Sequence, residues 1–106
     1  LLDFARAFNG PGLLDLASWH GTIDCPDESR LGELLEAYAS AGGHRQVSAS
    51  RGGLTAERWA LGWHRVWAVD WFLDQATCWI NDPTTDPVYL TAVRRHLTEA
   101  VTFLAP

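Results

Sequence analysis

The chain contains no lysine and no methionine, and its eight basic residues are all arginine. Chemistry that needs a lysine amine or ammonium therefore cannot be carried out by these residues. Without an initiator methionine, and with an abrupt opening on the apolar run at residues 1–4, the sequence predicts a piece of a longer protein. At 106 residues it amounts to one domain at most.

Cysteine, positive charge and long apolar runs are also scarce. Cys25 and Cys78 are too few for a disulfide framework and lack metal-ligand spacing. The net charge of -5 argues against a nucleic-acid partner, which needs clustered positive charge. No run approaches the roughly 18 apolar residues of a membrane span, and the opening lacks a basic signal-peptide start. We expect a soluble, cytoplasmic protein without membrane or nucleic-acid partners.

The hydrophobic fraction of 47% is that of a folded protein, and its spacing predicts a mainly α fold. Residues 1–4 suggest a strand end, and residues 9–12 a turn. We predict a short helix over 13–19 and a second helix that carries Leu31 to Ala39, is capped by Asp27 or Ser29 and stops at Gly42-Gly43. Residues 44–53 have loop composition, the best candidate for a mobile segment. A long helix over 56–80, opened by Thr55, and a turn over 81–86 follow.

The long helix is apolar nearly all round, so we expect it to be covered on most sides. The six tryptophans are accordingly predicted to be core residues rather than a ligand cage. The last helix, to about residue 104, is predicted to begin with Asp86 as cap and Pro87 at its first position. Its expected buried residues are Leu90, Val93, Leu97, Ala100 or Val101, and Leu104. Its expected water-facing residues are Arg94, Arg95 and Glu99.

An acidic motif near the start is the most informative feature. Asp3 ends the predicted strand, a Gly-Pro turn follows, and Asp15 opens Asp-Leu-Ala, twelve positions after Asp3. This pattern resembles the aminoglycoside phosphotransferase family. The Leu-Glu-Ala-Tyr late in the second helix also suits the C-terminal lobe of that family. The resemblance implies the helical C-terminal part of a protein-kinase-like (α+β) fold, with residues 1–106 as an incomplete domain.

The resemblance also implies roles for the two acids. Asp3 would be the metal ligand that grips the Mg²⁺ bridging the phosphates of ATP. Asp15 would support the site by accepting hydrogen bonds from backbone amides of the catalytic loop. The glycine-rich loop, the phosphate-pairing lysine and the His-Gly-Asp catalytic loop are missing, and His20-Gly21-Thr22 only superficially echoes the last. We therefore expect a kinase fragment that is inactive alone, with no catalytic residue of its own.

Asp70 and Asp74 lie one turn apart beside Trp63 and Trp67 on the long helix. They could bind a cationic amine of the small molecule that accepts the phosphate, such as an aminoglycoside. Aromatic faces beside carboxylates bind ammonium groups well. The more ordinary alternative is that they pair with arginines such as Arg58 or Arg65, or face solvent. His64 and His96 are expected at the surface or in packing, because neither has a second ligand at metal-binding spacing.

A second hypothesis belongs to another functional class. The chain could be a non-catalytic helical module whose exposed tryptophan face docks a partner chain or a copy of itself. In the kinase hypothesis the same exposed apolar face would instead pair with the missing lobe or self-associate. The two hypotheses differ in what precedes the chain, since the kinase requires a His-Gly-Asp and an Asn within some tens of residues upstream.

Overall fold

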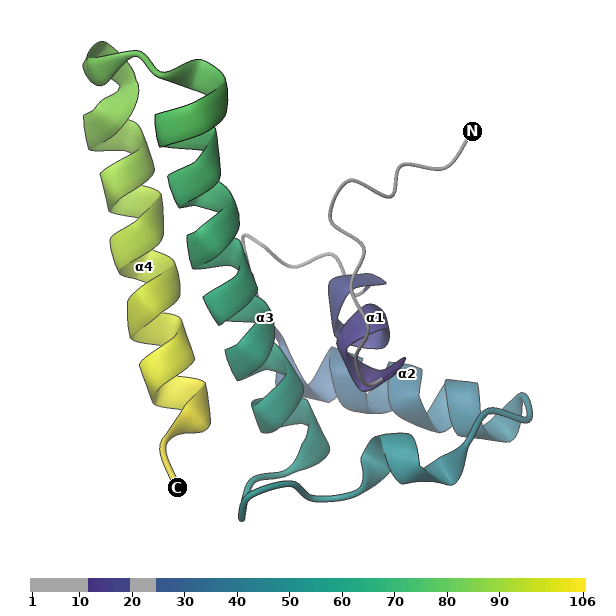
Figure 1. Ribbon diagram of the computed structural model, residues 1–106. Helices are drawn as coiled ribbons and strands as arrows, with labels where there is room; N and C mark the ends of the chain where they lie inside the picture. The colour runs from purple at the N-terminus through teal and green to yellow at the C-terminus, as the bar shows by residue number, and fades with distance from the viewer. Residues whose placement is uncertain (1–11, 20–24) are drawn as a thin grey trace, which may run out of the picture.

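The computed structural model describes residues 12–19 and 25–106, and this part of the chain is almost entirely helical. It contains four α-helices and three short 3₁₀ or π segments (Figure 1). The α-helices are α1 (Gly12–Trp19), α2 (Glu28–Ser40), α3 (Ala56–Asp74) and α4 (Asp86–Leu104). The short segments are η1 (Arg45–Ser48), η2 (Gln75–Ile80) and η3 (Pro83–Thr85). The predicted mainly α class is thus confirmed, whereas the predicted strand at residues 1–4 lies outside the described residues.

The helix ends follow the predicted capping chemistry. Asp27 Oδ1 accepts a hydrogen bond of 3.1 Å from the backbone N–H of Arg30 at the start of α2. Thr55 Oγ1 accepts one of 3.2 Å from the N–H of Arg58 at the start of α3. These bonds satisfy amides that the first helical turn leaves without a partner.

A glycine pair ends α2. Gly42 adopts a φ of 101°, which side-chain-bearing residues rarely reach. The N–H of Gly43 then donates to the carbonyl of Tyr38 at 2.9 Å, and the N–H of Gly42 to that of Ala39 at 3.1 Å. Together these bonds make a Schellman ending, which satisfies the last carbonyls of the helix. The predicted stop is confirmed.

The segment 44–53, predicted to be a loop, includes one short 3₁₀ turn. This turn is η1, and its Val47 is buried in the core. Arg51 and Leu54 exchange two backbone hydrogen bonds of 3.0 Å around Gly52 and Gly53, both at positive φ. Such a tight turn needs glycine at both central positions. The Arg51 guanidinium lies 5.2 Å from the centre of the Trp59 ring, which holds the turn against α3.

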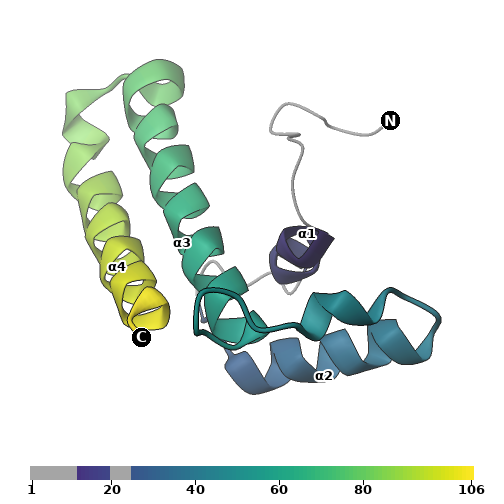
Figure 2. The same ribbon diagram turned by 60° about the horizontal axis from the view of Figure 1, so that its bottom comes forward.

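The core sits where α1, α2 and the first half of α3 meet. In Figures 1 and 2, α1 lies in the angle between α2 and α3. Small residues on α3 let the neighbouring helices approach closely, and leucines from α1 and α2 fill the space. Each fully buried leucine is worth about 1.5–3 kcal/mol. The core residues are Leu13, Ala17, Leu31, Leu35, Val47, Ala56, Ala60 and Leu61.

Helices α3 and α4 form a long antiparallel hairpin (Figure 1). They pack tightly at Gly62, where an added Cβ would lie 2.5 Å from Cγ of Leu104. Further along, the Phe72 ring lies 5.1 Å from that of His96 and 6.3 Å from that of Tyr89. No described helix is long and apolar enough to cross a membrane.

Polar groups are buried inside this hairpin. Arg65 is completely buried, and its Nε lies 2.7 Å from Oε2 of Glu99 on α4. The contact is a close ion pair without the alignment of a hydrogen bond. The prediction that Glu99 faces water is therefore wrong, because the buried guanidinium needs a counter-charge. His64 and His96 are buried as well, which confirms packing as their role.

Of the six tryptophans only Trp59 packs against the core, contrary to the prediction that all are core residues. Trp19 is 81% exposed, Trp79 73% and Trp63 45%, and the other three are only half-buried. The second half of α3 extends beyond α1 and α2 (Figure 2), so that one neighbour, α4, covers a single stripe of it. Small residues such as Ala60 and Ala68 occupy the buried positions instead.

Helix α4 shows the same departure from prediction. Leu90 and Leu97 are exposed, and Val93 and Leu104 are only half-buried. Ala100 is buried, as predicted for Ala100 or Val101, and His96 is buried as well. The capping residue also differs from the prediction. Asp86 is the first residue of α4, while Asp82 caps the preceding η3 segment by accepting a 3.0 Å hydrogen bond from the N–H of Thr84. The predicted turn over 81–86 is otherwise in place.

Candidate functional site

Asp15, the predicted supporting acid, lies in the first turn of α1. Leu13 and Ala17 anchor this helix in the core, and both are almost completely buried. Asp15 lies two residues from each of them, so its side chain is turned by about 200° from theirs, and it is exposed. In the described part of the chain the Asp15 carboxylate is exposed, so it is accessible to another segment of the protein. Its role as an acceptor for catalytic-loop amides stays a prediction, and Asp3, the predicted metal ligand, lies outside the described residues.

Asp70 and Asp74 lie on the second half of α3, as predicted. Asp70 is exposed, whereas Asp74 is half-buried, and both also take part in interactions within the chain. The half-buried rings of Trp67 and Trp71 come from the same stretch of helix. Trp67 stacks on His64 at 5.7 Å, and Trp71 meets the Phe72 ring edge-on at 5.0 Å. Carboxylates beside fixed aromatic rings are a suitable surface for an organic cation.

The two arginines considered as partners for these acids have close contacts elsewhere. Arg58 Nη1 lies 3.8 Å from Glu28 Oε1, and Nη2 donates a 2.6 Å hydrogen bond to the carbonyl of Thr102. Arg65 is held by Glu99. The contact of Arg58 ties α3 to both α2 and α4, so this arginine stabilises the junction of three helices.

The described acids do not converge on one site. Helix α1 packs against Ala60 and its neighbours, and Asp70 lies ten residues further along α3, about 15 Å along the axis. In the described part of the chain, no group of three or more His, Cys, Asp or Glu side chains could hold a metal ion.

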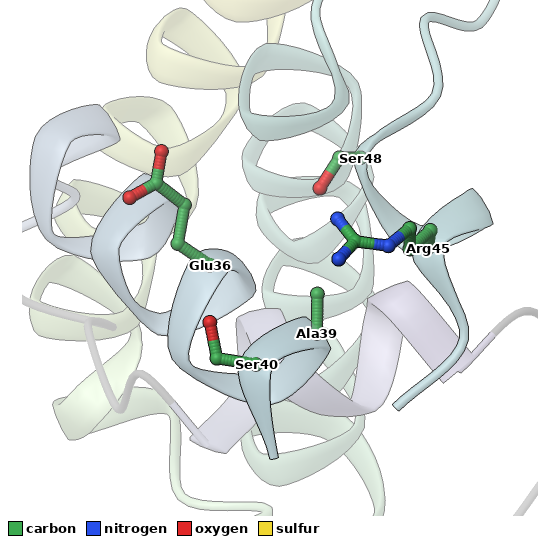
Figure 3. Close-up of a pocket in the computed structure, with 5 residues that line it drawn as sticks. All are labelled: Glu36, Ala39, Ser40, Arg45 and Ser48. Carbon is green, nitrogen blue, oxygen red and sulfur yellow. The ribbon is translucent and has the colours of Figure 1, made fainter. Parts of the chain in front are cut away.

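A hollow of about 390 Å³ lies between the end of α2 and η1. Figure 3 shows the Arg45 guanidinium pointing across it toward the last turn of α2. Most of its polar lining is exposed, with no buried polar group directed into it. Sequence reasoning missed it, because its two walls are brought together by the glycine turn after α2. The lining residues are Glu36, Ala39, Ser40, Arg45 and Ser48.

The Arg65–Glu99 pair was also missed from the sequence. Arg65 stands in a stretch that is otherwise apolar on most sides, between Trp63 and Trp67. A lone arginine surrounded in this way was the available signal, since a buried arginine requires an acid on the facing element.

No protein-family model, no curated protein and no solved structure matches this chain. Functional assignment therefore depends on the motif and on the geometry of the residues themselves.

Proposed function

We propose that this chain is the helical, acceptor-side part of a small-molecule kinase of the aminoglycoside phosphotransferase type. The observation that supports this is the motif from Asp3 to Ala17, whose second half forms α1. Leu13 and Ala17 of this helix are fixed in the core while Asp15 faces outward. An outward-facing acid at this point is accessible to a neighbouring catalytic loop.

In this proposal Asp3 binds Mg²⁺. Magnesium prefers hard oxygen ligands and takes one or two carboxylates together with phosphates and waters. The bound ion would neutralise charge on the phosphates of ATP. Asp15 accepts hydrogen bonds from backbone amides of the catalytic loop and so positions that loop without touching the substrate.

The acceptor would carry a hydroxyl and a cationic amine, as an aminoglycoside or a choline-like metabolite does. Asp74 is the better placed of the two acids on α3, because it is half-buried in the stretch that carries Trp67 and Trp71. Asp70, exposed one turn earlier, lies at the edge of that surface. Desolvation strengthens the attraction between a carboxylate and an ammonium group.

The protein-kinase-like fold belongs to the same proposal, as does a cytoplasmic location with access to ATP. The phosphate-pairing lysine and the catalytic loop would come from a preceding part of a longer protein. Phosphoryl transfer depends on positioning and charge neutralisation, so the chain alone is expected to be inactive.

Phosphate transfer from labelled ATP tests the proposal. The longer product of the reading frame is assayed against aminoglycosides, choline and sugars. Asp3→Ala should lower the rate by about 10²-fold or more, since one preorganised charge contact is lost. Asp82→Ala, which changes an exposed acid far along the chain, is the matched control and should retain activity. Equal rates for Asp3→Ala and the parent protein would refute the metal role.

A second candidate is the non-catalytic interaction module, favoured by the exposure of Trp19, Trp63 and Trp79. Large exposed aromatic rings are enriched at binding surfaces. The coding sequence upstream of Leu1 distinguishes the two candidates. A His-Gly-Asp followed by an Asn within some tens of residues supports the kinase, and the absence of both supports the module.

A further inference from the structure

The α3–α4 hairpin exposes a set of aliphatic residues that resemble the contact positions of a helical bundle. Their exposed fractions are between 38% and 65%. On α4 two of them, Leu90 and Leu97, are seven residues apart, as are Val66 and Leu73 on α3. A seven-residue repeat of this kind is typical of helices that pack along their length. We call the set Val66, Leu73, Leu90, Leu97 and Val101 the aliphatic face.

The five residues lie on one side of the hairpin. Each directly follows a residue that is buried or in contact between the helices: Arg65, Phe72, Tyr89, His96 and Ala100. Each is therefore turned by about 100° from the line where α3 and α4 touch. In an antiparallel pair of helices, the residue that directly follows a contact residue points to the same side of the pair on both helices. The exposed aliphatic side chains thus form one continuous surface.

The other side of α4 is mostly polar, with the exposed Val88 near the start of the helix as an exception. Arg95 is exposed there together with three threonines, Thr91, Thr98 and Thr102. Each threonine hydroxyl donates to the carbonyl four residues earlier, at 2.9, 2.9 and 3.0 Å. Helix α4 is therefore amphipathic beyond what packing on α3 requires. Contiguous exposed apolar surface of this extent is unusual on a monomer and marks an interaction site.

Charge on the rim of the aliphatic face indicates what covers it. Asp70 lies five residues after Arg65 on α3, and Arg94 lies five residues before Glu99 on α4. Since Arg65 and Glu99 are in contact, Asp70 and Arg94 lie at the same height, about 7.5 Å further along the hairpin. Both are exposed. The face thus has an acid on one helix and a base at the same level on the other.

This pattern is self-complementary. A two-fold axis parallel to the helices would place α3 of one copy over α4 of the second, antiparallel and at equal height. Asp70 would then meet Arg94 of the other copy, and the contact would occur twice. A two-fold axis perpendicular to the helices at the level of these charges would instead place Asp70 near Asp70 and Arg94 near Arg94, which is unfavourable. Charge complementarity therefore favours the first arrangement, an up-and-down four-helix bundle.

We propose that two copies of this chain associate through the aliphatic face, forming a four-helix bundle in which Asp70 pairs with Arg94 of the second copy. Helices of 19 residues are about 28 Å long, and a pair is about 20 Å wide. The footprint of roughly 560 Å² per copy is near the lower limit for a specific interface. The dimer should therefore be weak, with a micromolar dissociation constant, and it does not depend on the proposed kinase activity.

Sedimentation of the full chain over a micromolar concentration series, without nucleotide, tests the proposal. The weight-average mass should rise from monomer to dimer. Leu97→Glu should shift the dissociation constant at least about tenfold, because it buries an unpaired charge. Thr91→Glu on the polar side of α4 is the matched control and should leave the constant unchanged. Circular dichroism checks that each variant remains helical.

A charge exchange tests the geometry separately. Asp70→Arg and Arg94→Asp should each weaken the dimer, and the two changes together should restore it. A monomer at all concentrations would overturn the proposal, as would a dimer indifferent to Leu97→Glu. Failure of the double exchange to restore association would overturn the placement of α3 over α4. Binding of lipid vesicles or of another protein in place of self-association would also count against it.

Discussion

Arg65 and Glu99 form an ion pair between α3 and α4, in which Nε and Oε2 lie 2.7 Å apart and the arginine side chain is wholly buried. Removing one partner leaves the other charge in a medium that solvates it poorly. We predict that Glu99→Ala lowers the free energy of unfolding by about 3–5 kcal/mol. Urea denaturation followed by circular dichroism measures the change. Glu33→Ala, an exposed acid on α2, should change it by less than about 0.5 kcal/mol.

The same ion pair leads to a second prediction. The double variant Arg65→Met with Glu99→Leu removes both charges and keeps most of the volume, so its stability should be close to that of the parent. A double variant as unstable as Glu99→Ala would show that packing, rather than the stranded charge, causes the loss.

Gly62 lies where α3 packs tightly against Leu104 of α4. An added methyl group would lie 2.5 Å from the Leu104 side chain, so Gly62→Ala should force the helices apart and cost about 1–3 kcal/mol. Gly32 on α2 is the matched control. Its added Cβ would meet only Oε1 of Glu57, at 3.2 Å, the end of a flexible side chain. Gly32→Ala should therefore raise stability by up to about 1 kcal/mol, through helix propensity. Thermal or urea unfolding measures both changes. If both substitutions changed the free energy of unfolding in the same direction, this account would be contradicted.

Asp82 provides a pH-dependent contribution to stability. The Thr84 hydroxyl donates to its carboxylate at 2.8 Å and the Thr84 N–H at 3.0 Å, and these bonds hold the pKa of Asp82 below its usual value of 3.8. A lowered folded-state pKa stabilises the protein above pH 3.8 and loses that effect as the pH falls through the folded-state value. Thr84→Val should raise the pKa toward 3.8, measured by NMR titration of the side chain.

The control for this titration is Thr85→Val. The Thr85 hydroxyl donates to the backbone carbonyl of Asp82 at 2.8 Å and not to the carboxylate. Its removal should leave the pKa of Asp82 where it is. An unchanged pKa in Thr84→Val would show that the hydroxyl bond does not hold the carboxylate in its charged form.

Local sequence patterns predicted the helices well, because capping and glycine chemistry act within a few residues. Asp27, Thr55 and Gly42 ended or began helices where their side-chain chemistry requires it. Burial was predicted poorly, because periodicity identifies an apolar stripe without identifying the neighbour that covers it. Trp79 and Leu97 lie on such stripes and are exposed, since α1 and α2 reach only the first half of α3.

The candidate site could be predicted only as a motif. Asp15 is on a helix start as expected, but the residues that would complete a magnesium site lie outside the described ranges. The buried pair of Arg65 and Glu99 joins positions 34 residues apart, and no local pattern links such positions. Long-range pairing of this kind depends on the register of α3 against α4, which Gly62 and Leu104 determine.

Binding of Mn²⁺, used as a paramagnetic substitute for Mg²⁺, tests the kinase proposal most directly. The longer product is titrated with Mn²⁺ in the presence of a non-hydrolysable ATP analogue, and the free ion is measured by electron paramagnetic resonance. The account predicts nucleotide-dependent Mn²⁺ binding that is lost in Asp3→Ala and retained in Asp27→Ala. Equal Mn²⁺ binding by Asp3→Ala and the parent protein would contradict it.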